Sequence, residues 1–124
     1  MDKILLSINP EYADKIINGE KRFEYRKFVP KNDISSIIIY ETKPVRKIIA
    51  EAEVIGIIML TPENLWLETK RFSGITKEQF DDYFHERHVA YAYKLGRITV
   101  YKKPMELKDF GLKSPPQSFV YIKK

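Results

Sequence analysis

Cysteine is absent from this sequence of 124 residues, and histidine and tryptophan are scarce, with two copies and one copy. Without cysteine the fold can form no disulfide and no thiolate metal site, and a cysteine nucleophile is excluded. No apolar run approaches the length of a membrane span, and the run 4–6 is too short for a signal peptide. These absences predict a soluble, cytoplasmic protein without a membrane partner.

Several common functional motifs are also missing. The sequence has no phosphate-binding loop, no dinucleotide fingerprint and no clear helix-turn-helix pattern, which excludes P-loop nucleotide hydrolysis. His85 and His88 are three residues apart, but no third ligand stands at helical spacing. We therefore expect neither a metal nor a cofactor.

The composition that remains is basic and rich in aromatic residues. Lys and Arg outnumber Asp and Glu by 22 to 17, which gives a net charge of +5 and favours polyanionic partners. Eight Tyr and seven Phe suit either a β-rich core or stacking on planar ligands. The length predicts a single domain over residues 1–124.

Apolar runs and alternating patterns predict six or seven strands. Gly56 is a candidate bulge within one long strand, and Gly96 is a candidate hairpin turn between two shorter ones. The predicted ranges are 3–8, 21–28, 34–40, 48–60, 88–95, 97–103 and 119–122. Together with helices between the strands, this pattern predicts an α+β fold built on a small mixed β-barrel with two or three inserted helices.

Three helix starts are visible between these strands. Asn9 and Thr61 each precede a proline, which is typical of a capping side chain followed by the first helical residue. Thr76 and Gln79 match a capping box for a third helix. The first helix is expected to end at Gly19, where a positive φ lets the chain turn sharply.

This glycine belongs to the densest charged stretch, 18–27 with the sequence NGEKRFEYRK, and the charged residues follow directly after it. Read as a strand, it places Arg22, Glu24 and Arg26 on one face, with the face opposite formed by Lys21, Phe23, Tyr25 and Lys27. Glu24 can then hold a guanidinium whose remaining N–H groups stay free for an anion. The alternative is a solvated edge of mixed charge.

A second basic segment and a possible catalytic set complete the candidates. Lys43, Arg46 and Lys47 fall in a predicted exposed loop, 42–47. A lysine can act as a base where burial or a cationic neighbour lowers its pKa. The corresponding set would be Lys21 and Glu24, with a hydroxyl from either Ser7 or Thr42.

The order of motifs along the chain resembles the ASCH domain family, named for homology to an activating signal cointegrator. The motifs are LLSINPEYADKIINGEKRFEYRK, IIIYET, AEAEVIGIIMLTPENLW, FDDYF and SPPQSF, which together cover essentially the whole chain. The most diagnostic are GxKxxExR, here Gly19, Lys21, Glu24 and Arg26, and PPQSF at 115–119. The likeness is greatest to stand-alone microbial members.

This resemblance implies a β-barrel related to the PUA fold, with a cleft along the GxKxxExR strand that binds RNA or a modified nucleoside. Lys21, Glu24 and Arg26 are the matching cleft residues, and we add Ser7 from the neighbouring first strand. One branch of the wider family resembles amidohydrolases that deacetylate N4-acetylcytidine with a lysine, a threonine and a glutamate. This sequence keeps Lys21 but has Glu24 where that branch has the threonine.

Three hypotheses follow, and they leave open whether the protein is an enzyme. The first is an RNA- or nucleotide-binding module, and the second is an amidohydrolase that uses Lys21 and Glu24. The third is a ligand-sensing or protein-interaction domain in transcription or translation regulation, in which Glu24 and Arg26 form only a structural ion pair. The binding residues of the first hypothesis are Ser7, Lys21, Arg22, Glu24, Arg26, Lys43, Arg46 and Lys47.

Overall fold

The structure, a computed structural model, describes residues 1–122, and six strands within this range form one mixed sheet. Their bounds are β1 Asp2–Ile8, β2 Phe23–Arg26, β3 Ile34–Glu41, β4 Lys47–Leu60, β5 Ala90–Met105 and β6 Val120–Ile122. The strand order is β2-β5-β4-β3-β1-β6, with β1 parallel to β3 and the other pairs antiparallel. The α+β class is confirmed. The sheet is open at β2 and β6, so it is not a closed barrel.

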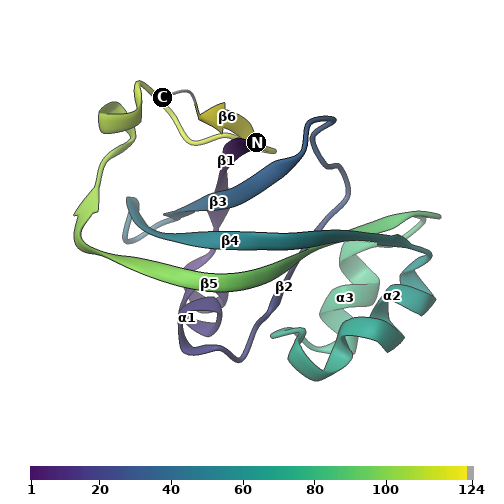
Figure 1. Cartoon of the computed structure of the whole chain (residues 1–124). Helices are drawn as coiled ribbons and strands as arrows, with labels where there is room; N and C mark the ends of the chain where they lie inside the picture. The colour runs from purple at the N-terminus through teal and green to yellow at the C-terminus, as the bar shows by residue number, and fades with distance from the viewer. Residues whose placement is uncertain (123–124) are drawn as a thin grey trace.

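Three α-helices and two 3₁₀ turns connect the strands. They are α1 Pro10–Asn18, α2 Pro62–Thr69, η1 Lys70–Phe72, α3 Lys77–Tyr83 and η2 Leu107–Phe110. In Figure 1, α2 and α3 lie together near one end of the long strands β4 and β5, while η2 and β6 lie toward the other end. No helix within residues 1–122 is long and apolar enough to cross a membrane.

The helix starts follow the sequence signals, with one exception. The Thr61 hydroxyl accepts from the backbone N–H of Asn64, and Thr76 and Gln79 form the expected capping box. Asn9 has the extended backbone of a capping residue, but its side chain does not cap α1. Its Oδ1 instead accepts a hydrogen bond of 3.2 Å from the Thr42 hydroxyl, which ties α1 to the loop after β3.

The predicted hairpin turn at Gly96 is wrong, because β5 runs without interruption from Ala90 to Met105. A Cβ atom at Gly96 would lie 2.5 Å from Oε1 of Glu53 and 2.8 Å from Cγ2 of Ile55. The glycine therefore permits a close approach of β4 to β5 rather than a turn. The predicted irregularity at Gly56 is confirmed, since the β4–β5 register shifts there.

An aromatic cluster fixes the position of the short strand β2. Tyr25, in its middle, packs edge-on against Phe80 and Phe84 under α3, with ring centres 5.0 and 6.2 Å apart. Because successive residues of a strand point in opposite directions, Glu24 and Arg26 face away from this cluster. There they lie toward β1, whose Ile4, Leu6 and Ile8 belong to the main apolar core.

Candidate functional site

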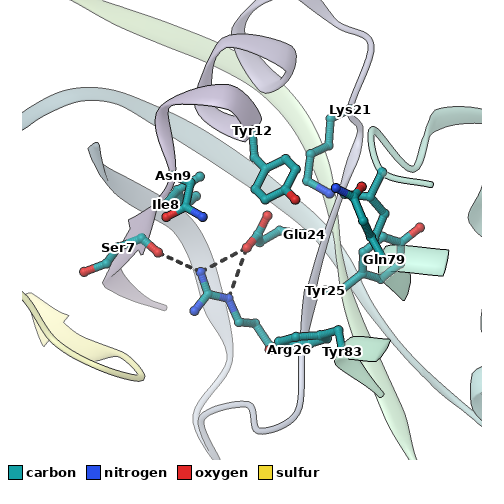
Figure 2. A pocket seen from close by; sticks show the side chains of 11 residues that line it. Ser7, Ile8, Asn9, Tyr12, Lys21, Glu24, Tyr25, Arg26, Gln79 and Tyr83 are labelled. Atoms are coloured by element: carbon teal, nitrogen blue, oxygen red, sulfur yellow. Dashed lines mark hydrogen bonds and ion pairs between the residues drawn. The ribbon is translucent and has the colours of Figure 1, made fainter. Parts of the chain in front are cut away.

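A cavity of about 250 Å³ opens where the end of β1, the start of α1, β2 and α3 meet. Figure 2 shows Tyr12, Lys21, Glu24 and Arg26 turned toward this space from three different segments. The remaining lining residues are Ser7, Ile8, Asn9, Tyr25, Ile75, Gln79 and Tyr83. The GxKxxExR motif thus supplies its lysine, glutamate and arginine to one pocket.

Lys21 is almost completely buried, with 3% of its surface exposed. Its Nζ donates a hydrogen bond of 2.7 Å to the backbone oxygen of Ser73 and lies 4.7 Å from the ring centre of Tyr25. Gly74 packs against the lysine stem, because a Cβ added there would lie 2.5 Å from the Lys21 Cβ. The residues before α3 therefore hold this side chain in one position.

Burial lowers the pKa of Lys21, since the charged ammonium loses its hydration. Glu24 opposes this change by favouring the charged form, while Arg26 and Lys15 lower the pKa of Lys21 further. The result is a lysine that releases its proton more readily than an exposed one. Such a group can bind an anion when charged and accept a proton when neutral.

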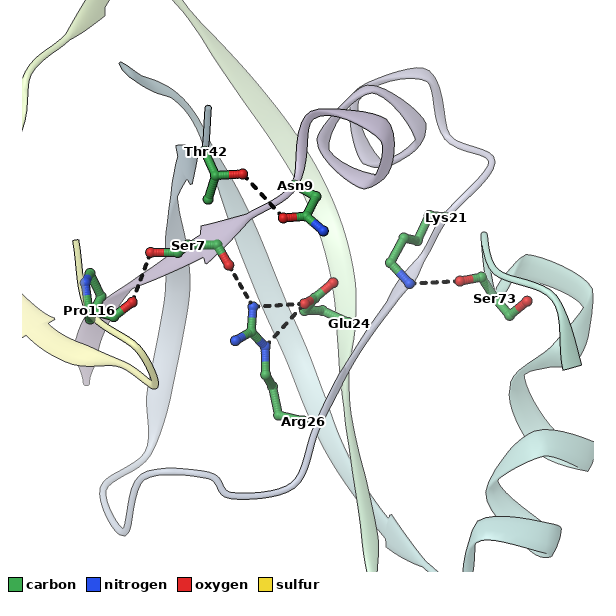
Figure 3. A network of polar contacts seen from close by, with 8 residues as sticks. All are labelled: Ser7, Asn9, Lys21, Glu24, Arg26, Thr42, Ser73 and Pro116. Atoms are coloured by element: carbon green, nitrogen blue, oxygen red, sulfur yellow. Dashed lines mark hydrogen bonds and ion pairs between the residues drawn. The ribbon is translucent and has the colours of Figure 1, made fainter. Parts of the chain in front are cut away.

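Glu24 and Arg26 form a largely buried ion pair at the opposite wall of the pocket. The Glu24 Oε2 atom accepts from Arg26 Nη2 at 2.9 Å and from Arg26 Nε at 3.1 Å. Nη2 also donates to the backbone oxygen of Ser7 at 3.0 Å, so the guanidinium bridges β2 and β1 (Figure 3). Within residues 1–122, Nη1 of Arg26 has no hydrogen-bond partner.

The aromatic wall of the pocket comes from Tyr12 and Tyr83. Figure 2 shows the Tyr12 hydroxyl near the Glu24 carboxylate. The pKa of Tyr12 is raised by burial, with further contributions from Glu11 and Glu24. Burial likewise raises the pKa of Tyr83, while Arg26 opposes that change. Both phenols are therefore neutral at physiological pH, and they offer flat rings as well as hydrogen-bonding hydroxyls.

The hydroxyl candidates for catalysis do not approach Lys21. Ser7 lines the cavity, but its Oγ donates to the backbone oxygen of Pro116 at 2.9 Å. The Thr42 hydroxyl donates to Asn9, and Thr42 does not line the cavity. In Figure 3 both hydroxyls lie on the side of the Glu24–Arg26 pair opposite to Lys21. Neither of the two hydroxyls expected from the sequence therefore stands beside Lys21.

The expected grouping of Arg22 with Glu24 and Arg26 is wrong. Strand β2 begins only at Phe23, so the alternation does not extend back to Arg22. The Arg22 backbone bonds to the Phe72 oxygen and the Leu95 N–H, and its guanidinium stacks on Phe72, 4.2 Å from the ring centre. Arg22 is exposed outside the pocket, and Lys21 instead lines the pocket beside Glu24 and Arg26.

The loop between β3 and β4 is exposed, as expected, but it does not line the cavity. Lys43 and Arg46 extend into solvent, while Lys47 begins β4 and lies 3.6 Å from Glu106. The backbone N–H of Thr42 donates to the Ile8 oxygen at 3.0 Å. The loop therefore adjoins the pocket at the β1–α1 junction.

Sequence reasoning missed several residues that line the pocket or support it from outside the GxKxxExR motif. Tyr12 was indicated only as part of an apolar helix stripe, and Tyr83 only as part of an apolar helix face. Ser73 carried no signal, because its contact with Lys21 joins residues 52 positions apart. Among residues 1–122, no three histidine or carboxylate side chains gather as metal ligands would.

The family model of the ASCH domain matches residues 6–100, and the chain therefore belongs to the ASCH domain family. The ASCH domain-containing ribonuclease of Zymomonas mobilis is 31% identical, over 97% of this chain and 84% of that protein. ATP synthase subunit alpha of Ureaplasma parvum is 26% identical over 97% of this chain, which spans only 15% of that protein's length.

A solved structure agrees with this family assignment. The crystal structure of a mutant ZmASCH protein from Zymomonas mobilis superposes with a TM-score of 0.91 at 29% identity. The superposition covers 100% of this chain and 92% of the ZmASCH chain. The open six-stranded sheet with its helices is therefore an ASCH fold.

Proposed function

We propose that this protein binds single-stranded RNA and that one nucleoside unit of the strand occupies the pocket of Lys21, Glu24 and Arg26. The observation that carries the proposal is the guanidinium of Arg26, held by Glu24 and the Ser7 oxygen while Nη1 stays unpaired within residues 1–122. A guanidinium fixed in this way presents its free N–H donors to phosphate oxygens or to an acceptor edge of a base.

The rest of the pocket suits a nucleoside. Tyr12 and Tyr83 supply rings on which a base can stack, and Glu24 supplies an acceptor for an exocyclic amine. The cavity of about 250 Å³ is slightly smaller than typical ligand pockets of about 300–1,000 Å³, which favours one unpaired nucleoside over a duplex. The likeness to a protein named as a ribonuclease supports RNA as the polyanion.

The direct test is a titration of fluorescently labelled single-stranded RNA at low and at high salt. The wild type should bind, with affinity that falls steeply as salt rises. The variant Arg26→Ala should bind much more weakly, whereas Lys102→Ala, which removes an exposed β5 lysine outside the pocket, should bind almost as the wild type does. An absence of RNA affinity at low salt would refute the proposal.

A second candidate function is hydrolysis in the same pocket, favoured by the lowered pKa of Lys21. The bond broken would be a phosphodiester of the bound RNA or, in the amidohydrolase alternative, the acetyl amide of N4-acetylcytidine. Because the Ser7 and Thr42 hydroxyls bond elsewhere, the amidohydrolase would use water as the nucleophile, with Lys21 or Glu24 as the base.

Turnover is tested by following RNA fragments and released acetate in parallel. Lys21→Met keeps the length of the side chain and removes its charge and proton, so it should abolish either reaction while the protein stays folded. Product formed equally fast by the variant would exclude Lys21 from the chemistry. If the wild type binds RNA but forms no product, hydrolysis is excluded and only the RNA-binding proposal remains.

The interaction-domain alternative gives Glu24 and Arg26 a purely structural role. It predicts that the double variant Glu24→Gln, Arg26→Met unfolds at a lower temperature and still binds RNA as the wild type does. The RNA-binding proposal predicts loss of affinity in that variant even under conditions where it is fully folded. Thermal unfolding and RNA titration of the same sample separate the two.

A further inference from the structure

A second groove lies beside the pocket and shares two of its residues. This groove has a volume of about 310 Å³, and Arg26 and Tyr83 line both cavities. Its other walls include Lys27 and Phe28, which directly follow β2, and Phe119 near the C-terminal strand. Pocket and groove therefore meet on either side of Arg26 and Tyr83.

Phe28 is the unusual residue of the groove, because 63% of its surface is exposed. The guanidinium carbon of Arg87 lies 4.8 Å from the centre of its ring. Arg87 Nη2 also donates to the backbone oxygen of Lys27 at 3.4 Å, which links it to the same short segment. An exposed ring flanked by a guanidinium is the arrangement on which an unpaired base stacks.

Two cations, Lys27 in the groove and Arg87 beside it, lie over aromatic rings. Lys27 Nζ lies 4.8 Å from the ring centre of Tyr83, as Arg87 lies over Phe28. Among the described residues, neither Lys27 nor Arg87 forms an ion pair with a carboxylate. Their positive charge is therefore not neutralised locally and remains available to a phosphate.

We infer that this groove binds the nucleotide next to the one in the pocket, with its base stacked on Phe28. The phosphate that joins the two nucleotides would lie against Nη1 of Arg26 and the ammonium of Lys27. This inference rests on the proposed function and deepens it, since it predicts a site two nucleotides long with Arg26 at its centre. Phe28 would add affinity without regard to base identity, because every base offers a flat face.

The test compares the dinucleotide UpU with two abasic analogues, each of which lacks one of the two bases but keeps the phosphate. The wild type should bind the analogue without the groove base about tenfold more weakly than UpU, which is the effect of one stacked base. Phe28→Ala should bind these two ligands equally, and Phe28→Trp should restore the preference. Met59→Ala removes an equally exposed apolar side chain outside both cavities and should behave as the wild type.

The outcomes separate this inference from the function on which it rests. The groove does not hold a stacked base if the wild type binds UpU and the analogue that lacks the groove base equally. The same conclusion follows if Phe28→Ala still prefers UpU over that analogue. RNA binding in the pocket would then still stand, provided that the other analogue and Arg26→Ala show weakened binding. If neither UpU nor longer RNA binds the wild type, both proposals fail together.

Discussion

The pocket and the loop between β3 and β4 both carry positive charge, but they hold it in different ways. In the pocket, Lys21 donates to the Ser73 oxygen, and Arg26 is fixed by Glu24 and the Ser7 oxygen. In the loop, Lys43 and Arg46 are exposed, and within residues 1–122 neither is in an ion pair. The same residue types thus give fixed donors in one place and diffuse charge in the other.

Under the proposed function, this difference predicts different parts in RNA binding for the two regions. A fixed, partly desolvated donor loses little conformational freedom when it binds, so it adds affinity and selects a geometry. An exposed lysine contributes mainly through long-range attraction, which salt screens. We therefore expect the pocket to decide what is bound and the loop to affect how binding depends on salt.

The largest effect is expected for Arg26→Ala. Loss of the charge-assisted donor should weaken RNA binding by about 1.5–3 kcal/mol, as measured by fluorescence titration. The variant should also unfold more easily, because Glu24 loses its partner in a largely buried position. Lys43→Ala is the matched control, and an equal loss of affinity in both variants would contradict the contrast between pocket and loop.

The second prediction concerns Gly74, which has a φ of +69° and packs against Lys21. Gly74→Ala should lower the free energy of unfolding by about 2–3 kcal/mol, from backbone strain and the contact with the lysine stem. Gly111→Ala is the control, since Gly111 has a φ of +75° but nothing within 4 Å of an added Cβ. Equal losses in chemical denaturation would show that Lys21 is not confined by this contact.

The third prediction follows from the lowered pKa of Lys21. Between this pKa and the ordinary value of 10.5, the unfolded chain binds more protons than the folded one, so this lysine makes stability rise with pH. The free energy of unfolding of the wild type, minus that of Lys21→Met, should therefore increase as the pH rises toward about 10.

The comparison is made below about pH 10 because of Tyr25, whose ring contacts Lys21. Burial raises the pKa of Tyr25 to about 12, which destabilises the fold at high pH. Below about pH 10 this tyrosine is protonated in both the folded and the unfolded chain, so it adds no pH dependence to the difference. A difference that stays flat with pH would mean that Lys21 keeps an ordinary pKa.

The smallest effect is expected in the loop. Arg46→Gln should change RNA affinity by less than about 1 kcal/mol and should reduce the slope of log K against log salt by about 1. The slope is obtained from titrations at four or five salt concentrations. If Arg46→Gln shows the wild-type slope, the β3–β4 loop does not contact the bound RNA.

Local signals in the sequence predicted many of the elements of the fold. The proline and threonine signatures gave the starts of α2 and α3, and apolar runs gave β1, β3 and β4. The pairing of Glu24 with a nearby arginine also follows from local spacing, since the two side chains lie on one face of a strand. Each of these features depends on residues that are close together in the chain.

The errors arose where distant contacts decide the local structure. Gly96 resembles a turn residue, but its role is set by Glu53 and Ile55 on the neighbouring strand. Lys21 and Arg22 were assigned to the wrong faces because the regular alternation of β2 begins only at Phe23. An open sheet cannot be distinguished from a barrel by strand patterns alone, because closure depends on pairing between the edge strands.

The proposed function places RNA in the pocket of Lys21, Glu24 and Arg26. The most direct measurement is an NMR titration of labelled protein with a short single-stranded RNA, in which backbone amides and the arginine Nε–H signals are followed. We predict that the Arg26 Nε–H and the amides of residues 7–12, 21–28 and 73–83 change most, while those of the β3–β4 loop change less. Changes confined to that loop, or to the exposed face of β4 at Ile55 and Met59, would contradict the claim.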